Sequence, residues 1–294
     1  MVVRAAALIL AALACGGATA QERRLTFATP DGDRFAIVDN IGAGARPAVI
    51  VLHGATVGAY ATLVSSGFRA AARAHGFVSV YPEGVDRIWR DGRGMRRGVD
   101  DRSFLLSLAQ RLVVEGIADQ KRIFLAGVSN GGIMALDMAC GAPDVFAGVG
   151  TVIAALAANT GAACPGGRPL PVVMASGDAD PIVPYEGGSV NVGFFHPRQG
   201  EVWGAERTAA FFAQRARCGD PTRQAVASAE ADDPKVTKIA WACAPATPVA
   251  LYRVEGGGHQ MFGGVALPAL AFGRTTKRFS AAQTIVSTFA GLPR

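Results

Sequence analysis

Residues 124–139, FLAGVSNGGIMALDMA, place one serine between an apolar run and a helix-forming run. Glycines lie two residues to either side of Ser129, at Gly127 and Gly131. A serine at a sharp strand-to-helix corner is held in a strained backbone conformation that exposes its hydroxyl, as a nucleophile requires. Side chains at the two glycines would collide where the strand and the helix nearly touch. We therefore predict a nucleophile at Ser129, although the same pattern also occurs in ordinary glycine-rich turns.

A serine nucleophile needs a base, and the chain has four histidines. In the strand-turn-helix arrangement the acid and then the histidine follow the serine, which excludes His53 and His75 as the base. His259 follows an apolar run and lies in EGGGHQMFGG, a loop flexible enough to bring an imidazole to the serine. His196 also lies downstream, but it precedes a proline in a Gly/Pro-rich loop. We predict His259 as the base and keep His196 as the alternative.

The acid that orients the base should lie in a loop after a strand between the serine and the histidine. Residues 170–188, LPVVMASGDADPIVPYEGG, supply a strand followed by Asp178 and Asp180. Pro181 follows Asp180 and stiffens its turn. We predict Asp180 as the acid, with Asp178 as the alternative.

An acyl-transfer site also needs two backbone N–H groups to bind the oxyanion that forms. One is expected from Asn130, the residue after the nucleophile, and the other from the HGAT loop at 53–56. Ala55 is the favoured second donor and Thr56 the alternative. No zinc site is expected, because the chain has no Cys-x-x-Cys or His-x-x-His spacing. A mechanism of this kind needs no metal or cofactor, so we expect none.

Strand-like and helix-like runs alternate along the chain, and the middle strands are apolar throughout. This pattern is typical of a mostly parallel α/β sheet covered on both faces by helices. The polar segment 218–247 is expected to be a surface excursion of one domain rather than a second domain. We predict strands at 24–29, 34–38, 47–53, 77–81, 122–127, 147–153, 171–176 and 248–254, and helices at 62–75, 101–114, 204–217, 277–290 and directly after Ser129.

The N-terminal segment 1–20 has the pattern of a secretory signal peptide: a basic residue, a short apolar run and an Ala-x-Ala site before Gln21. No apolar run in the chain is long enough to span a membrane. We therefore expect a secreted or periplasmic protein formed by residues 21–294. Processing as a lipoprotein at Cys15 is the alternative. Loss of Arg4 with this segment would lower the net charge from +6 to +5.

Four cysteines remain after residue 20, and an even number in an exported chain suggests two disulfides. Four cysteines allow three connectivities. Pairing of nearest neighbours closes two loops of similar size, and each bond would contribute on the order of 3 kcal/mol. The favoured pairs are Cys140 with Cys164 and Cys218 with Cys243.

A basic cluster lies at 87–97, where five arginines surround a single aromatic residue, Trp89. Nucleic-acid binding would need interleaved aromatics and a recognisable module, so we expect no nucleic-acid partner. A solvated loop is the simpler interpretation of this cluster, with contact to an anionic substrate as the alternative.

Taken together, the motifs resemble the secreted α/β-hydrolase esterases that include polyhydroxybutyrate depolymerases and feruloyl or acetylxylan esterases. They appear in the order of that family and cover nearly all of 21–294. The resemblance implies an α/β-hydrolase fold, a triad of Ser129, Asp180 and His259, and positions near the substrate cleft for Trp89 and Tyr185. A loop anchor is the alternative role for Trp89. The motifs are VIVLHG, YPEG, IWRDGR, VDDRSFL, RIFLAGVSNGG, MACGAPDVFAGV, GDADPIVPY and VEGGGHQMFGG, together with the RCG and AC cysteines.

Three departures from the family pattern bear on the substrate. Ala55 stands where a cysteine is usual, and residues 176–178 replace a His-Gly-Thr; neither changes the chemistry. Residues 261–262 replace a Trp-Pro pair after the histidine, which we expect to alter a pocket wall.

The expected activity is hydrolysis of carboxylic esters, either polyhydroxyalkanoate oligomers or feruloyl and acetyl esters of polysaccharide. Members that attack solid polymer usually carry an added binding domain, and no such segment follows helix 277–290. We therefore expect a soluble or oligomeric ester. The alternatives are a peptidase or a lipase on the same fold, or a non-catalytic surface protein.

Overall fold

The computed structural model describes residues 21–94, 98–191, 200–227 and 232–293. The predicted signal peptide at 1–20, with Cys15, lies outside these residues, as does the alternative base His196. None of the helices in the described ranges is long and apolar enough to cross a membrane.

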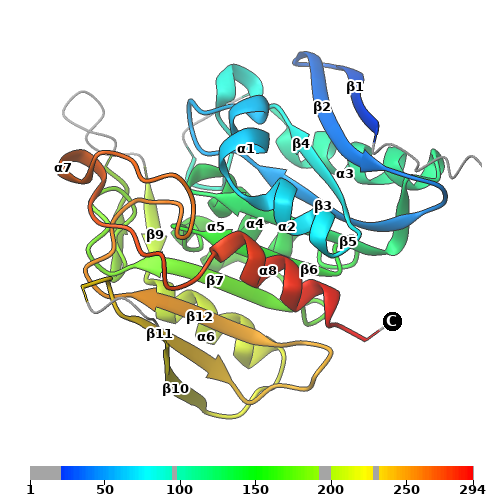
Figure 1. The fold of residues 1–294 in the computed structure, drawn as a ribbon. Helices are drawn as coiled ribbons and strands as arrows, with labels where there is room; N and C mark the ends of the chain where they lie inside the picture. The colour runs from blue at the N-terminus through cyan, green and yellow to red at the C-terminus, as the bar shows by residue number, and fades with distance from the viewer. Residues whose placement is uncertain (1–20, 95–97, 192–199, 228–231, 294) are drawn as a thin grey trace, which may run out of the picture.

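One ten-stranded sheet runs through the described part of the chain (Figure 1), in the order β1-β2-β4-β3-β5-β6-β7-β12-β11-β10. The six central strands, from β4 to β12, are parallel, and the two strands at each end are antiparallel. The strands of the sheet are β1 (Gln21–Thr29), β2 (Gly32–Ile41), β3 (Arg46–Leu52), β4 (Val78–Pro82), β5 (Ala118–Val128), β6 (Gly148–Val152), β7 (Val172–Gly177), β10 (Pro221–Val226), β11 (Val236–Trp241) and β12 (Val249–Val254).

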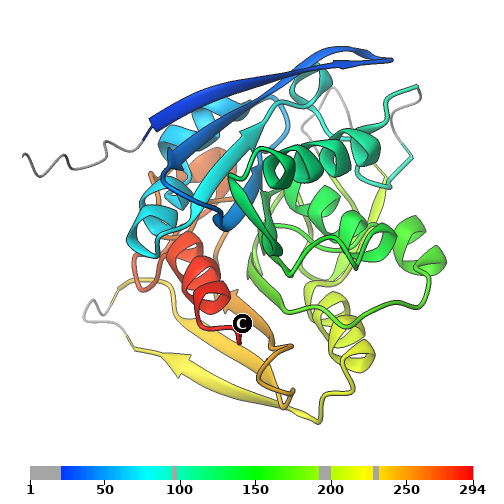
Figure 2. The ribbon, with the colours of Figure 1, turned by 90° about the vertical axis from the view of Figure 1, so that its right-hand side faces the viewer.

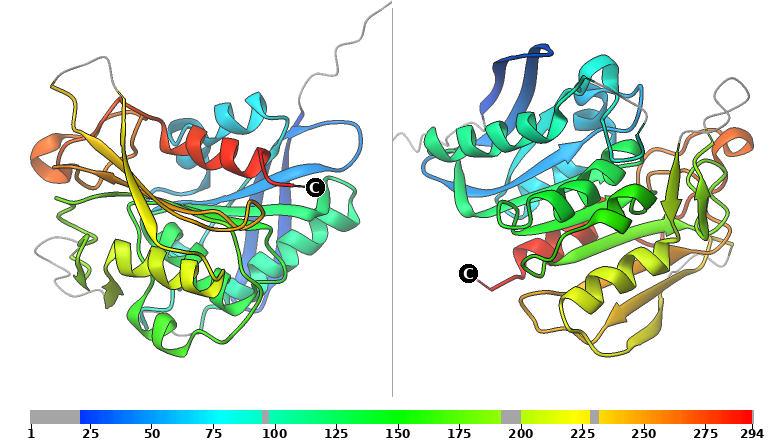
Figure 3. Two further views of the ribbon diagram at one scale, coloured as in Figure 1. Left: turned by 90° about the horizontal axis from the view of Figure 1, so that it is seen from below. Right: turned by 180° about the vertical axis from the view of Figure 1, so that it is seen from behind.

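Helices cover both faces of this sheet, which Figure 2 and Figure 3 show from several sides. One face packs against α1 (Ala59–Ser65), α2 (Phe68–Ala74) and α8 (Ala281–Ala290). The opposite face packs against α3 (Asp101–Val114), α4 (Asn130–Gly141) and α6 (Ala205–Arg215). Burial of the central strands on both faces explains why their sequences are apolar throughout. The predicted α/β-hydrolase architecture is confirmed.

Smaller elements lie near the carboxyl ends of the parallel strands. They are the 3-10 turn η1 (Val85–Arg87), α5 (Ala158–Ala163), α7 (Ala269–Phe272) and a separate two-stranded ribbon of β8 (Gly187–Ser189) and β9 (Glu201–Trp203).

Three predicted elements differ in the structure. The helix expected at 62–75 is divided into α1 and α2 at Gly67, whose φ of 77° ends one helix and starts the next. The last helix begins at Ala281 rather than 277, because the Ser280 side chain accepts a hydrogen bond from the Gln283 N–H and caps it. The segment 218–247 is not only a surface excursion, since it supplies β10 and β11 to the sheet.

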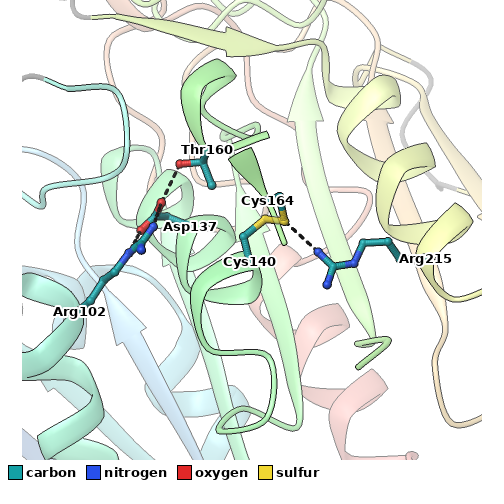
Figure 4. The surroundings of a disulfide bond; sticks show 6 residues. All are labelled: Arg102, Asp137, Cys140, Thr160, Cys164 and Arg215. Carbon is teal, nitrogen blue, oxygen red and sulfur yellow. Dashed lines mark hydrogen bonds and ion pairs between the residues drawn. A yellow bond between two sulfur atoms is a disulfide. The ribbon is translucent and has the colours of Figure 1, made fainter. Parts of the chain in front are cut away.

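Both disulfides form with the predicted nearest-neighbour pairing, Cys140–Cys164 and Cys218–Cys243. Figure 4 shows the first, which joins the end of α4 to the residue after α5. Beside it, the buried Asp137 of α4 binds Arg102 of α3 and Thr160 of α5, with contacts of 2.6 Å to each. Helix α4, which has Ser129 as its N-cap, is therefore fastened at its far end to α3 and α5.

Candidate active site

Ser129 lies at the corner between β5 and α4, with φ 53° and ψ −122°. This conformation is unfavourable for a residue other than glycine and is typical of strain stored at a functional site. A Cβ on Gly127 would overlap the carbonyl oxygen of Gly131, and a Cβ on Gly131 would overlap the carbonyl oxygen of His53. The two glycines are therefore required by close backbone approach, as predicted from the sequence.

The structure brings Ser129, His259 and Asp180 into one hydrogen-bonded line. His259 Nε2 lies 2.9 Å from Ser129 Oγ, and His259 Nδ1 lies 2.8 Å from Asp180 Oδ2. The three residues follow β5, β12 and β7 respectively, so all come from carboxyl ends of parallel strands, where such sheets place their functional groups. A histidine that donates from Nδ1 to a carboxylate leaves Nε2 free to accept the serine proton.

Asp180 is fixed by its own turn. Its Oδ1 accepts hydrogen bonds from the N–H groups of Ile182 and Val183 at 2.8 and 2.9 Å. The alternative acid, Asp178, instead accepts from Arg253 Nε at 2.9 Å and from the Gly256 N–H at 2.6 Å. The structure therefore places Asp180, and not Asp178, against the imidazole.

The loop before His259 is packed rather than flexible. The N–H groups of Gly258 and His259 donate to the carbonyl oxygens of Arg274 and Phe272, and a Cβ on Gly177 would overlap the Gly257 carbonyl oxygen. The glycines here serve close packing between neighbouring backbones, which replaces the flexibility inferred from their composition.

The next residue, Gln260, closes the loop that follows the histidine. Its fully buried side chain bonds the backbone N–H and the carbonyl oxygen of Leu267, and also the carbonyl oxygen of Gly273. Sequence reasoning missed this residue, because no local motif marks a glutamine that bonds residues 7 and 13 positions away. Phe262, expected at a pocket wall, is instead buried in the core beside Phe279.

The expected oxyanion donors lie beside the serine. The N–H groups of Ala55 and Asn130 have no hydrogen-bond acceptor within the described ranges, whereas the Thr56 N–H donates to the Arg87 carbonyl at 2.8 Å. A Cβ placed on Gly54 would lie 3.7 Å from the Ser129 Cβ, so the 53–56 loop borders Ser129. These contacts favour Ala55 over Thr56 as the second donor.

Trp89 occupies the role of a loop anchor. Its side chain has no exposed surface, its indole N–H donates to the His53 carbonyl at 3.0 Å, and its ring lies 4.9 Å from the His53 ring. A side chain buried in this way does not reach a substrate, so the predicted place in the cleft is corrected.

Tyr185 is also nearly buried, and its hydroxyl donates to Glu206 Oε1 at 3.0 Å. Burial, with Glu206 as the next cause, raises the pKa of the Tyr185 phenol. The ring shares a narrow pocket with Asp180 and lines a surface cavity of about 360 Å³ beside Trp203. Its contact with substrate stays a prediction.

The arginine cluster at 87–97 is not simply a solvated loop. Arg93 is buried and pairs with the Asp91 carboxylate at 2.6 Å, and the same carboxylate accepts from Asn130 Nδ2 at 2.6 Å. Arg96 and Arg97 lie outside the described residues. Arg93 and Asp91 therefore hold this loop against Asn130, the residue after Ser129.

The fold and the serine, histidine and aspartate on its strand ends define an α/β-hydrolase. Residues 36–186 match the family described as "Esterase PHB depolymerase", which covers half of the chain. The chain belongs to this family and is a carboxylic ester hydrolase.

Similar proteins agree with this membership. NocK of Nocardia uniformis subsp. tsuyamanensis, assigned as an esterase, is 33% identical over 261 residues, which are 84% of this chain and 74% of NocK. The poly(3-hydroxyalkanoate) depolymerase C of Paucimonas lemoignei is 29% identical over 113 residues, covering 36% of this chain and 27% of the depolymerase.

Among solved structures, the acetyl xylan esterase of Aspergillus awamori superposes with a TM-score of 0.54 at 13% identity, over 85% of this chain and 97% of that enzyme. At this identity the likeness concerns the fold alone.

Proposed function

We propose that the protein is an exported serine esterase that hydrolyses carboxylic esters through Ser129, His259 and Asp180 by way of an acyl-enzyme. The observation that carries this proposal is the continuous contact from Ser129 Oγ to His259 Nε2, 2.9 Å, and from His259 Nδ1 to Asp180 Oδ2, 2.8 Å. Hydrogen-bond reach between nucleophile and base, with the base oriented by a third group, is the geometry that nucleophilic catalysis needs.

In the first half of the reaction, Ser129 Oγ attacks the ester carbonyl carbon while its proton passes to His259 Nε2. The carbonyl oxygen becomes an oxyanion, which accepts hydrogen bonds from the N–H groups of Asn130 and Ala55. When the tetrahedral intermediate collapses, the ester C–O bond breaks and the alcohol takes the proton from His259. The acyl group then stays on Ser129.

In the second half, a water molecule gives a proton to His259 and attacks the acyl carbon. Collapse of this intermediate returns the proton to Ser129 Oγ and releases the carboxylic acid. Asp180 keeps the imidazole in the tautomer that accepts at Nε2 and stabilises its positive charge. Since Asp180 Oδ1 is held by two backbone N–H groups, the imidazole is oriented before substrate arrives.

Export is supported by the sequence of 1–20 and by the two disulfides, which persist in oxidising compartments.

For the substrate, the segment after the histidine favours an apolar polyester oligomer over a polysaccharide ester. Residues 263–271, GGVALPALA, are exposed along their whole length and have no polar side chain. Within them Val265 is 71% exposed and Leu270 fully exposed, on and beside the α7 turn seen at one edge of Figure 1. Exposed apolar surface of this kind marks a binding region.

The test measures hydrolysis of several esters with wild type and Ser129→Ala. The panel is p-nitrophenyl acetate, butyrate and octanoate, methyl ferulate, acetylated xylan and 3-hydroxybutyrate oligomers. We expect Ser129-dependent turnover, greatest on hydroxybutyrate oligomers, and covalent labelling of Ser129 by a fluorophosphonate. A preference for ferulate or xylan would reject the polyester assignment. Ester hydrolysis that persists in Ser129→Ala would reject the triad.

A further inference from the structure

Gln260 directly follows the expected base and is buried, although no step of the proposed reaction uses its side chain. Its Oε1 accepts a hydrogen bond from the Leu267 N–H at 2.9 Å. Its Nε2 donates to the carbonyl oxygens of Leu267 and Gly273, at 3.0 and 2.8 Å. A primary amide offers one acceptor oxygen and two N–H donors, and all of them are engaged here. The side chain is therefore fitted to these three backbone groups.

The apolar segment 263–271 is attached to the rest of the molecule through this side chain. Every residue of the segment is exposed, so packing alone holds it weakly. Within the described ranges, the hydrogen bonds that join residues 265–271 to anything outside their own turn are those to Gln260. They fix the backbone of Leu267 near the middle of the segment, and the bond to Gly273 fixes the point where the chain returns.

A continuous line of contacts leads from this segment to the nucleophile. Gln260 is bonded to Leu267, and its neighbour in the chain, His259, has its Nε2 2.9 Å from Ser129 Oγ. His259 is also held independently of Gln260, since its N–H donates to the Phe272 carbonyl and its Nδ1 contacts Asp180. Loss of the Gln260 bonds should therefore release the segment without releasing the base.

The segment presents uncharged aliphatic groups to its surroundings. Residues 260–273 contain no charged side chain, although 18% of the whole chain is charged. Val265 and Leu267 are 71% and 46% exposed, and Leu270 is fully exposed. Side chains this exposed gain free energy when an apolar group covers them. Since the segment adjoins the base of an ester hydrolase, the occupant whose chemistry fits is the aliphatic chain of the ester.

We propose that Gln260 is a positioning residue for substrate specificity, which holds the segment 263–271 next to His259 as a binding surface for the aliphatic chain of the ester. This inference rests on the proposed function, because it concerns the substrate that reacts at Ser129. A surface that is held in place before binding loses less conformational freedom when the chain binds. Gln260 should therefore favour esters with long chains and leave the reaction of short esters unchanged.

Two substitutions of Gln260 test this role. Gln260→Met keeps the length of the side chain and removes all three hydrogen bonds. Gln260→Glu keeps an acceptor for the Leu267 N–H, but as a carboxylate it loses both donors, and when protonated it regains one. Gln110→Met, at an exposed position on α3, is the matched control for the substitution itself.

We expect Gln260→Met to lower kcat/KM on p-nitrophenyl octanoate by roughly 10-fold, the effect of weakening apolar contact with about one leucine. The loss should lie in KM, because contacts with a chain remote from the carbonyl bind substrate and transition state alike. On p-nitrophenyl acetate, kcat/KM should change by less than about 2-fold, since its acyl group is too short to use these contacts. Gln110→Met should match the wild type on both esters.

The ratio of kcat/KM for octanoate to that for acetate provides a second measure. In Gln260→Glu this ratio should rise toward the wild-type value between about pH 8 and pH 6, because burial beside two carbonyl oxygens raises the pKa of the introduced carboxyl. The ratio cancels any pH dependence that both esters share. In Gln260→Met it should stay low throughout, and Gln260→Glu carries the test if Gln260→Met fails to fold.

A combined variant shows whether Gln260 acts through the leucines of the segment. If it does, Gln260→Met together with Leu267→Ser/Leu270→Ser should lose about as much activity on octanoate as the more damaging change alone. Losses that multiply would overturn the inference.

Three further results would overturn it and leave the proposed function intact. They are an equal loss on both esters, a ratio in Gln260→Glu that shows no response to pH, and wild-type dimers that disappear in Leu267→Ser/Leu270→Ser while the ratio is unchanged. The last of these would assign the segment to self-association. Ester hydrolysis that persists in Ser129→Ala would overturn both the inference and the proposed function.

Discussion

The side chain of Asn130 and the backbone of Trp89 hydrogen-bond in both directions. Asn130 Oδ1 accepts from the Trp89 N–H at 2.8 Å, and Asn130 Nδ2 donates to the Trp89 carbonyl at 3.0 Å and to Asp91 at 2.6 Å. The residue that follows Ser129 therefore holds the 89–91 loop through its side chain, while its backbone N–H has no acceptor among the described residues. We therefore expect Asn130 to contribute both to folding stability and to catalysis.

Replacement of Asn130 by Ala should weaken both properties. The change keeps the backbone N–H but leaves the Trp89 N–H and carbonyl buried without partners, at a cost of about 2–4 kcal/mol in the free energy of unfolding. We also expect at least a roughly 10-fold loss of kcat, because the loop that buttresses both donors is loosened. Urea unfolding and ester kinetics measure the two effects. Asn159→Ala, at an exposed position on α5, should change neither; wild-type stability in Asn130→Ala would refute the role of the side chain.

A pair of matched substitutions distinguishes the roles of Asp180 and Asp178. Asp180→Asn removes the charge that orients His259 and should lower kcat by about 10³–10⁴-fold with little change in the fold. Asp178→Asn weakens the ion pair with the half-buried Arg253 and should cost only about 1 kcal/mol of stability, with kcat nearly unchanged. The measurement is kcat together with the melting temperature of each variant. A larger catalytic loss in Asp178→Asn would reverse the assignment of the acid.

The buried His53 makes folding stability depend on pH. Its pKa is lowered in the folded protein, chiefly by burial and also by Arg34, while Glu83 and Asp101 act in the opposite direction. In the unfolded chain the His53 imidazole has a pKa near 6.5, so below that pH it binds a proton that the folded chain does not bind. Above about pH 7, this group should therefore cause no pH dependence in the free energy of unfolding. Below pH 6.5 it should fall by up to ~1.4 kcal/mol per pH unit until the folded pKa is reached.

Urea unfolding of the wild type and of His53→Asn between pH 5 and 7.5 tests this dependence. The variant should be less stable at pH 7 but should lose stability less steeply on acidification. Parallel slopes for the wild type and His53→Asn would contradict a neutral buried His53.

Much of this site was accessible from sequence because each part follows an apolar strand. Ser129, Asp180 and His259 could be placed at strand ends, and the fold follows from alternating strands and helices. Contacts across the chain were not accessible in the same way. The bond from Trp89 to His53 joins residues 36 apart, and nothing local distinguishes a buried tryptophan anchor from one that binds substrate.

The edge strand β10 also could not be predicted from the local sequence. β10 is exposed along almost its whole length and has a polar sequence, PTRQAV, so it lacks the apolar pattern that marks a strand. Its pairing with β11 from Pro221 to Val226 depends on backbone hydrogen bonds between segments brought together by the chain on either side. A polar segment of this kind forms a strand because of the neighbouring strand with which it pairs. The hydrophobic periodicity of its own sequence does not reveal that neighbour.

The two disulfides should contribute nearly equal stability. They close loops of similar length, with sequence separations of 24 and 25, so removing either by paired Cys→Ser substitution should cost about 3 kcal/mol. Activity of the folded Cys140→Ser/Cys164→Ser variant should persist at 25 °C, because Asp137 still binds Arg102 and Thr160 across the same helices (Figure 4). Denaturant unfolding with parallel kinetics provides the measurement. Complete loss of activity in a folded variant would show that the bond itself shapes the site.

The exposed segment 263–271 should strengthen the binding of apolar substrates and leave the chemical steps unchanged. In Leu267→Ser/Leu270→Ser the hydrogen bonds of the Gln260 side chain remain, since those to residue 267 are made with backbone atoms. Contact of each leucine with an apolar substrate would contribute at most about 1.5–3 kcal/mol. With partial contact, we expect a roughly 10-fold loss of kcat/KM on emulsified hydroxybutyrate oligomers and an unchanged value on p-nitrophenyl acetate. Val114→Ser, at an exposed apolar residue on α3, is the control. An equal loss on both esters would mean that the segment supports His259 and not the substrate.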